Sequence, residues 1–174
     1  MNIEKTSPRR NGGSPSLRLG VDIGRVIIDG DGPDTSFIGG TDADAMRVPP
    51  MAGAFAALAR LRARFDGLVW IVSKCGPRIE ARSRAWLERQ RFFETTGILR
   101  HNLRFCRNRR DKTPICEELG IAFFVDDRLD VLVPMAGIVA HRFLFGVSSS
   151  SDPSVRPVAT WAVAESAIVA ILDA

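Results

Sequence analysis

The feature that most constrains the fold of this chain is a short apolar run that recurs along it and leads to a polar residue. The first run lies within LRLGVDIGRVII (17–28), and the clearest later ones cover 68–72 and 121–125. Such runs, rich in β-branched residues and bounded by turn-forming residues, are typical of strands that are buried on both faces. Further strands are predicted over 103–106 and near 141–145.

Between these runs, apolar residues recur at the spacing of amphipathic helices. The pattern predicts helices over 51–65, 77–90, 113–119, 129–135 and 160–172. In the second of these, Trp86 and Leu87 are expected to face the core and Arg82 to face solvent. Strands that alternate with helices indicate an α/β domain with a central, mostly parallel sheet flanked by helices, which is a three-layer Rossmann-like fold.

Polar segments set the expected domain organisation. Residues 1–16 contain Gly and Pro among polar residues and are predicted to form a disordered N-terminal arm, which leaves 17–174 as a single domain. The segment 29–50 is rich in Gly, Asp and Pro and is long for a connection, so we expect a mobile loop or a minimal cap there. Residues 148–157 are predicted to form a Ser/Pro-rich linker.

Charge and cysteine content narrow the class of protein. The formal net charge of +4 and the pI near 9.5 suit anionic ligands, but the excess is too small to establish nucleic-acid binding. Three cysteines without a CxxC pair favour a reducing cytoplasm over a disulfide framework or a zinc site. No apolar run approaches the ~20 residues that cross a bilayer. The sequence therefore predicts a cytoplasmic protein without a membrane partner.

Three of the predicted strands lead to polar residues, namely Asp22, Ser73, and the pair Asp126 and Asp127. A lone aspartate at such a place more often only caps a turn, but the carboxyl ends of parallel strands share one edge, so these residues are expected to converge. Clustered carboxylates repel one another, and Mg²⁺, which takes oxygen ligands and a substrate phosphate, relieves that repulsion. Lys112, near the start of a predicted helix, would add a fixed positive charge.

The order of these motifs, with h for an apolar residue, is hhhDxG, hhhS, Lys and hhhDD between about Leu17 and Leu132. It resembles the haloacid dehalogenase (HAD) superfamily of phosphohydrolases. The segments VSKCGPRIEARSRAWL and FFVDDRLDVL resemble its small, nucleotidase-like members. The resemblance implies a HAD-like fold, an Mg²⁺ cofactor and hydrolysis of a small phosphorylated substrate such as a nucleotide.

The resemblance also implies roles for individual residues. Asp22 would be the nucleophile that attacks phosphorus and forms an aspartyl-phosphate. Ser73 would hydrogen-bond the transferring phosphoryl group, while Lys112 would neutralise its charge and orient the nucleophile. Lys74 and Arg25, which neighbour these motifs, are further candidates for contacts to substrate.

The same resemblance implies a metal site. Asp22 and Asp126 would bind Mg²⁺ together with the backbone carbonyl of Gly24. Asp127 would act as a further ligand or would support the other ligands.

Gly24 is also where the chain departs from the family's pattern. Phosphatases of the family usually read DxDxT and place a second aspartate there as general acid and base, a role worth about 10²–10⁴-fold in rate. Three alternatives follow for this chain. The leaving group needs no proton, or Asp29 or another acidic residue of the next loop supplies it, or the protein binds a phosphorylated ligand with little turnover.

Two other features carry alternative interpretations. The segment RHNLRFCRNRRDK (100–112) holds six Arg and Lys and is expected to be a solvated edge. Contact with nucleic acid, without any chemistry, is the alternative for it. Cys75 lies beside the predicted phosphate-binding serine, but no histidine stands at a recognisable partner spacing. We therefore expect Cys75 to be a small buried side chain and not a nucleophile.

Overall fold

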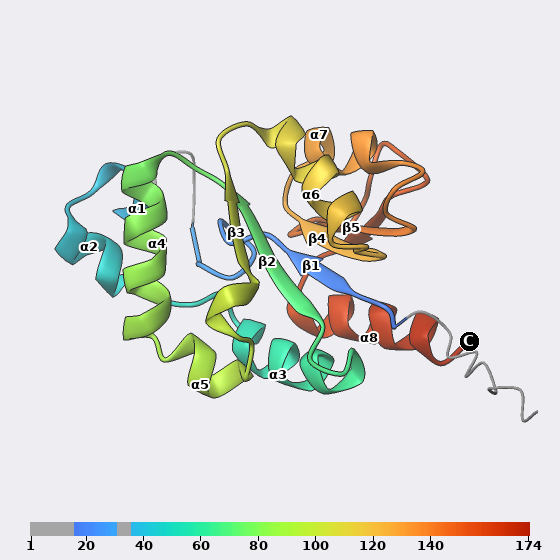
Figure 1. Cartoon of the computed structure of the whole chain (residues 1–174), viewed down its shortest axis with the longest axis horizontal. Coiled ribbons are helices and arrows are strands. Elements are labelled where there is room, and N and C mark those ends of the chain that lie inside the picture. Colours follow the sequence, from blue (N-terminus) through green and yellow to red (C-terminus); the bar gives the residue numbers. More distant parts are fainter. Residues whose placement is uncertain (1–15, 31–35) are drawn as a thin grey trace, which may run out of the picture.

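The structure is a computed structural model that describes residues 16–30 and 36–174, so the predicted N-terminal arm, except for Ser16, lies outside the described residues. Its centre is one six-stranded sheet in which every pairing is parallel, in the order β3-β2-β1-β4-β5-β6. The strands are β1 (Leu19–Val21), β2 (Val69–Lys74), β3 (Leu103–Cys106), β4 (Phe123–Asp126), β5 (His141–Phe145) and β6 (Arg156–Val158). The chain winds from β1 first to one side and then to the other (Figure 1).

Helices cover both faces of this sheet (Figure 1). The α-helices are α1 (Ser36–Gly39), α2 (Asp42–Arg47), α3 (Ala54–Arg64), α4 (Pro77–Arg89), α5 (Phe92–Thr96), α6 (Lys112–Glu118), α7 (Leu129–Leu132) and α8 (Trp161–Leu172). Three 3₁₀ turns are η1 (Arg100–Asn102), η2 (Arg109–Asp111) and η3 (Val133–Met135). Helices α3, α5 and α8 lie on one face and α6 and α7 on the other, which confirms the three-layer Rossmann-like fold. In the described part of the chain, no helix is long and apolar enough to cross a membrane.

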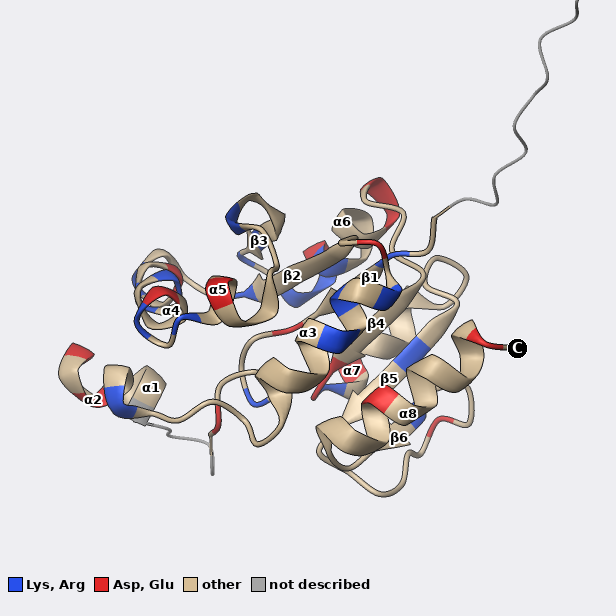
Figure 2. Ribbon diagram, turned by 90° about the horizontal axis from the view of Figure 1, so that it is seen from below, with Lys and Arg blue, Asp and Glu red and all other residues tan. Residues whose placement is uncertain are grey.

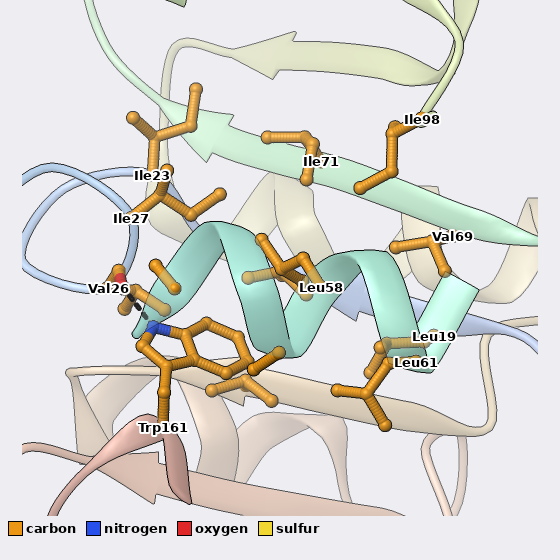
Figure 3. Close-up of a cluster of buried hydrophobic side chains, with 14 of the residues drawn as sticks. Leu19, Ile23, Val26, Ile27, Leu58, Leu61, Val69, Ile71, Ile98 and Trp161 are labelled. Atoms are coloured by element: carbon orange, nitrogen blue, oxygen red, sulfur yellow. Dashed lines mark hydrogen bonds between the residues drawn. The ribbon is translucent and has the colours of Figure 1, made fainter. Parts of the chain in front are cut away.

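Each face of the sheet packs against its own hydrophobic cluster. Along β4, Phe123 and Val125 join the larger cluster under α3 and α8, whereas Phe124 joins the smaller one under α6 and α7. Figure 3 shows part of the larger cluster, in which Leu58 and Leu61 of α3 pack against the strands. Because both faces are buried, the central strands β1, β2 and β4 lie within mostly apolar runs of the sequence.

Gly20 permits a close approach between the two central strands. A Cβ added at Gly20 would lie 2.5 Å from Cδ2 of Phe124, which is far inside van der Waals contact. The Phe124 ring therefore fills the space that a side chain on β1 would occupy, and only glycine fits at this position.

The apolar run at 17–28 forms a strand only in its first part. β1 ends at Val21, and the chain then turns so that the carbonyl oxygen of Ile23 accepts hydrogen bonds from the N–H groups of the three residues 26–28. The apolar side chains of this turn are buried in the larger cluster. The turn thereby ends the strand and places the residues after β1 at the end of the sheet where the carboxyl ends of the strands lie.

Several predicted boundaries move because of tertiary contacts. The helix predicted over 51–65 begins at Ala54, since the Met51 N–H donates to the carbonyl of Ile27 at 2.7 Å. The segment predicted as a loop over 29–50 contains α1 and α2 in its described part, and the predicted linker over 148–157 ends in the edge strand β6.

The prediction that Arg82 faces solvent is wrong. Arg82 is only 5% exposed, and its guanidinium donates to the carbonyl oxygens of Phe37 at 2.7 Å and of Gly40 at 3.2 Å. It also donates to Oδ1 of Asp42 from Nε at 2.9 Å. Arg82 thus anchors the α1–α2 segment on α4, since burying the charge is acceptable only when its donors are satisfied.

Candidate functional site

A cleft of about 390 Å³ lies at the carboxyl ends of β1 and β2, close to the point where the winding of the chain reverses. Open α/β sheets bind ligands at this reversal, between β1 and β4 in this chain. The predicted site residues line the cleft, except for Asp126, which is fully buried. Those that line it are Asp22, Gly24, Arg25, Ser73, Lys74, Lys112 and Asp127.

Three carboxylates from two adjacent strands meet at this point. Oxygen atoms of Asp22, Asp126 and Asp127 all lie within 4.8 Å of one another. The pairing of Val21 with Val125 sets this arrangement, and the Asp22 N–H extends it by donating to the Val125 carbonyl at 3.0 Å. The sheet register thus brings together residues that lie about a hundred positions apart in the sequence.

Lys112 is the first residue of α6 and holds two of these carboxylates. Its side chain is 3% exposed, and its Nζ lies 2.9 Å from Asp22 Oδ1 and 2.7 Å from Asp126 Oδ2. Burial alone would lower the pKa of Lys112, but the attraction of Asp22 and Asp126 outweighs it and raises that pKa. The ammonium is therefore charged at neutral pH.

The carboxylates outnumber the buried positive charge. Burial, followed by repulsion from Asp22, raises the pKa of Asp126, although Lys112 opposes the shift. Burial and Asp22 also raise the pKa of Asp127, although Arg25 pairs with Asp127 Oδ2 at 2.5 Å. The cluster is thus short of positive charge in a region of low dielectric constant.

The donor set fits a hard divalent cation. Asp22 Oδ1 is buried, and Lys112 Nζ, which lies 2.9 Å from it, is shared with Asp126. Buried carboxylates whose charge is only partly compensated are costly. Mg²⁺ prefers one or two carboxylates together with waters and a phosphate, so Asp22, Asp126 and Asp127 could hold it.

Position 24 has room for the side chain that the sequence lacks. A Cβ added at Gly24 would meet no heavy atom of the described chain within 4 Å, and the residue is exposed. The next residue, Arg25, adopts the left-handed backbone region with φ of 57° and reaches across to Asp127. The absence of an aspartate at position 24 is therefore not imposed by packing.

The end of β2 supplies the groups expected to bind phosphate. Ser73 is 7% exposed and Lys74 is exposed, and both line the cleft. Cys75 follows them and is buried, as predicted. Burial, reinforced by the charge of Glu80, raises the pKa of the Cys75 thiol to about 11, so the thiol is protonated at neutral pH and is a poor nucleophile.

Among the described acidic residues of 29–50, only Asp29 lines the cleft. Asp42 is ion-paired to α4, and Asp44 caps α2 through the backbone of Thr41 at 3.0 Å. The aspartates at 31 and 34 lie outside the described residues. Asp29 is therefore the described residue of this segment that could stand in for the missing acid.

Two arginines that the sequence did not single out also line the cleft, namely Arg109 and Arg128. The Arg128 N–H donates to Asp126 Oδ1 at 2.9 Å, which fixes the orientation of that carboxylate. The position of Arg128 directly after the two aspartates was the only signal for it, whereas Arg109 was hidden among the charges of the basic segment.

Comparisons with protein-family models and with curated proteins each returned no match. The resemblance to the HAD superfamily therefore depends on the motif residues and on the convergence of their side chains in the cleft.

Proposed function

We propose that the chain is an Mg²⁺-dependent, HAD-like phosphohydrolase that acts on a nucleotide or another small phosphomonoester through an aspartyl-phosphate at Asp22. The observation that carries this proposal is the position of Lys112 Nζ between Asp22 and Asp126, 2.9 Å and 2.7 Å away, at the reversal point of the sheet. A structural ion pair would need one carboxylate, whereas this site gathers three, of which Lys112 contacts two and Arg25 pairs with the third. The excess of carboxylate groups is suited to a cation that also binds a phosphate.

In the first step, an oxygen of Asp22 attacks phosphorus and the bond to the substrate oxygen breaks, which leaves a phosphoryl group on the carboxylate. Lys112 orients Asp22, while the Ser73 hydroxyl and the Lys74 ammonium hold the phosphoryl oxygens. Mg²⁺, when bound by Asp22, Asp126 and Asp127 with the Gly24 carbonyl, would offset the negative charge that gathers there.

In the second step, water attacks the same phosphorus, inorganic phosphate leaves and the Asp22 carboxylate is restored. Both steps move a proton, and position 24 carries no group that can do so. Arg25 is no substitute, because its guanidinium stays protonated. The proposal therefore includes either Asp29 as the proton carrier or a substrate whose leaving group is acidic enough to depart unprotonated, in which case the proton of the attacking water passes to the released phosphate.

The second candidate function is binding of a phosphorylated ligand with little turnover. Gly24 favours it, because the residues suited to binding Mg²⁺ and phosphate are present and the acid is missing. For either function we propose a reducing location such as the cytoplasm, because the three cysteines are buried and unpaired.

The test is release of phosphate from nucleotides, sugar phosphates and an aryl phosphate, with and without Mg²⁺. The aryl phosphate is included because its leaving group needs no proton. The matched control is Asp22→Asn, which keeps the size of the side chain and removes its nucleophilic charge. Turnover that requires both Mg²⁺ and Asp22 supports the hydrolase. Binding of Mg²⁺ and phosphate without turnover supports the second candidate instead.

A further inference from the structure

A second hollow, which we call the basic groove, adjoins the cleft. It has a volume of about 480 Å³, and its charged lining consists of Lys74, Arg107, Arg109, Arg110 and Asp130. The cleft and the basic groove share Lys74 and Arg109, so a molecule bound at Asp22 can extend from one into the other.

The positive charges of the basic groove are only partly compensated. Its acidic residue, Asp130, already receives the Arg128 guanidinium at 2.9 Å and lies 3.6 Å from Arg109. Arg107 pairs with Glu80 at 2.9 Å, outside the groove lining. Lys74 and Arg110 form no ion pair with any residue in 16–30 or 36–174.

Several arginines on other parts of the surface are ion-paired, whereas the exposed Arg78, Arg89 and Arg156, like Arg110, form no ion pair with a described residue. Arg60 forms a two-pronged contact with Glu165 at 2.6 and 2.7 Å, and Arg100 does the same with Glu88 at 2.6 Å. Figure 2 shows this mixture of charge on α4, which carries both Arg (blue) and Glu (red). The basic segment 100–112 is thus divided, because its start is neutralised by α4 and its end leaves charge in the basic groove.

We infer that the basic groove binds a second phosphate group of the substrate whose first phosphate lies at Asp22. This inference rests on the proposed function. The Lys74 ammonium and the Arg110 guanidinium, which form no ion pair with a described residue, are suited to phosphate oxygens, and the shared lining by Lys74 and Arg109 joins the basic groove to the cleft that contains Asp22. The Thr113 hydroxyl adds a neutral donor to the groove.

Two sources present this chemistry, namely a nucleoside bisphosphate and the phosphorylated end of a short nucleic-acid strand. In both, the second phosphate follows the first through one sugar, so the groove would select its substrate by charge and reach, without reading a base. A phosphate site of this kind loses affinity as salt rises.

The test measures binding, so that it does not depend on turnover. Titration calorimetry with Mg²⁺ on Asp22→Asn protein compares adenosine 5′-monophosphate, adenosine 3′,5′-bisphosphate and a 5′-phosphorylated tetradeoxynucleotide. We expect the bisphosphate, the tetradeoxynucleotide or both to bind about fivefold or more tightly than the monophosphate, as one partly exposed charged contact provides. Adding Arg110→Ala is expected to remove most of this preference.

The matched control is Arg89→Ala, because Arg89 is an exposed arginine on α4 that lines neither the cleft nor the basic groove. It should leave the preference unchanged. Equal affinities for all three probes, or an equal loss of preference in Arg110→Ala and Arg89→Ala, would overturn the inference and leave the proposed function intact. Failure of all three probes to bind would count against both. The probe with the larger gain identifies the source of the second phosphate.

Discussion

Restoring an aspartate at position 24 tests directly whether the missing acid limits this site. The substitution Gly24→Asp requires no rearrangement, since a Cβ there meets no heavy atom of the described chain within 4 Å. It places a fourth carboxylate in the cleft that contains Asp22 and Asp127. Its backbone φ lies outside the left-handed region, so a side chain at this position adds no strain.

The magnitude follows from two opposing effects. General acid–base catalysis is worth about 10²–10⁴-fold, so kcat should rise by at least about 100-fold if Asp22, Ser73 and Lys112 are competent. Carboxylate oxygens within 4.8 Å of one another repel by at least about 3.5 kcal/mol at an effective dielectric constant of 20, and a new carboxylate at the exposed position 24 adds a smaller penalty of roughly 1 kcal/mol. The variant should therefore unfold at a lower temperature without Mg²⁺ and regain stability when Mg²⁺ is added.

The assay is steady-state release of phosphate from a phosphomonoester with a poor leaving group, together with thermal unfolding at two Mg²⁺ concentrations. Gly24→Asn is the matched control, because it has the same size and cannot exchange a proton. A kcat that stays within about threefold of the parent in both variants, in folded protein that binds Mg²⁺, would refute the argument that position 24 supplies the missing proton transfer.

Three further predictions concern the surroundings of the cleft. Lys112→Met removes the ammonium between Asp22 and Asp126 and should cost about 3–5 kcal/mol in the free energy of unfolding measured in urea, partly recovered with Mg²⁺. A loss below about 1 kcal/mol would contradict the buried ion pairs. Arg82→Met should lower stability by about 2–3 kcal/mol and raise KM more than it lowers kcat, because the α1–α2 segment loses its anchor. Equal effects on KM and kcat would argue against that role. The Cys75 thiol, whose pKa burial raises to about 11, should react slowly with iodoacetamide in native protein at pH 8 and faster as the pH nears that value, because its reactive thiolate forms only there. Mass spectrometry would disprove this if Cys75 reacted at pH 8 as fast as in unfolded protein.

The sequence predicts those parts of the fold that local pattern determines. β3 and β5 have the predicted bounds, and α4 and α8 differ from prediction by one residue at an end. A strand of mostly apolar residues leaves a short apolar run in the sequence, and a helix with one buried face leaves a periodic pattern. The helices α1 and α2 and the strand β6 leave none. They are too short for a period and form through contacts with α4 and β5.

In the candidate site, too, some features follow from local sequence pattern and others depend on tertiary contacts. The aspartates after β1 and in β4 could be expected to meet, because strand ends share an edge in a parallel sheet. The burial of Arg82 could not be predicted, since a charged residue in a helix pattern normally faces water. The carbonyl groups that accept hydrogen bonds from Arg82 belong to a segment whose sequence shows no periodic pattern. The free space at Gly24 and the uncompensated charge of Arg110 are likewise properties of three-dimensional neighbours.

A hydrogen bond from the Trp161 indole completes the turn next to this site, and Trp161 is synthesised long after that turn. Its Nε1 donates to the carbonyl of Val26, in the turn after Asp22, at 2.7 Å (Figure 3). The two residues are 135 positions apart, so the turn after Asp22 is synthesised early but forms this hydrogen bond late. A nascent chain that has released every strand from the ribosome still lacks this hydrogen bond until α8 emerges. Contacts of such long sequence separation form slowly, so we expect this turn to order in one of the last steps of folding.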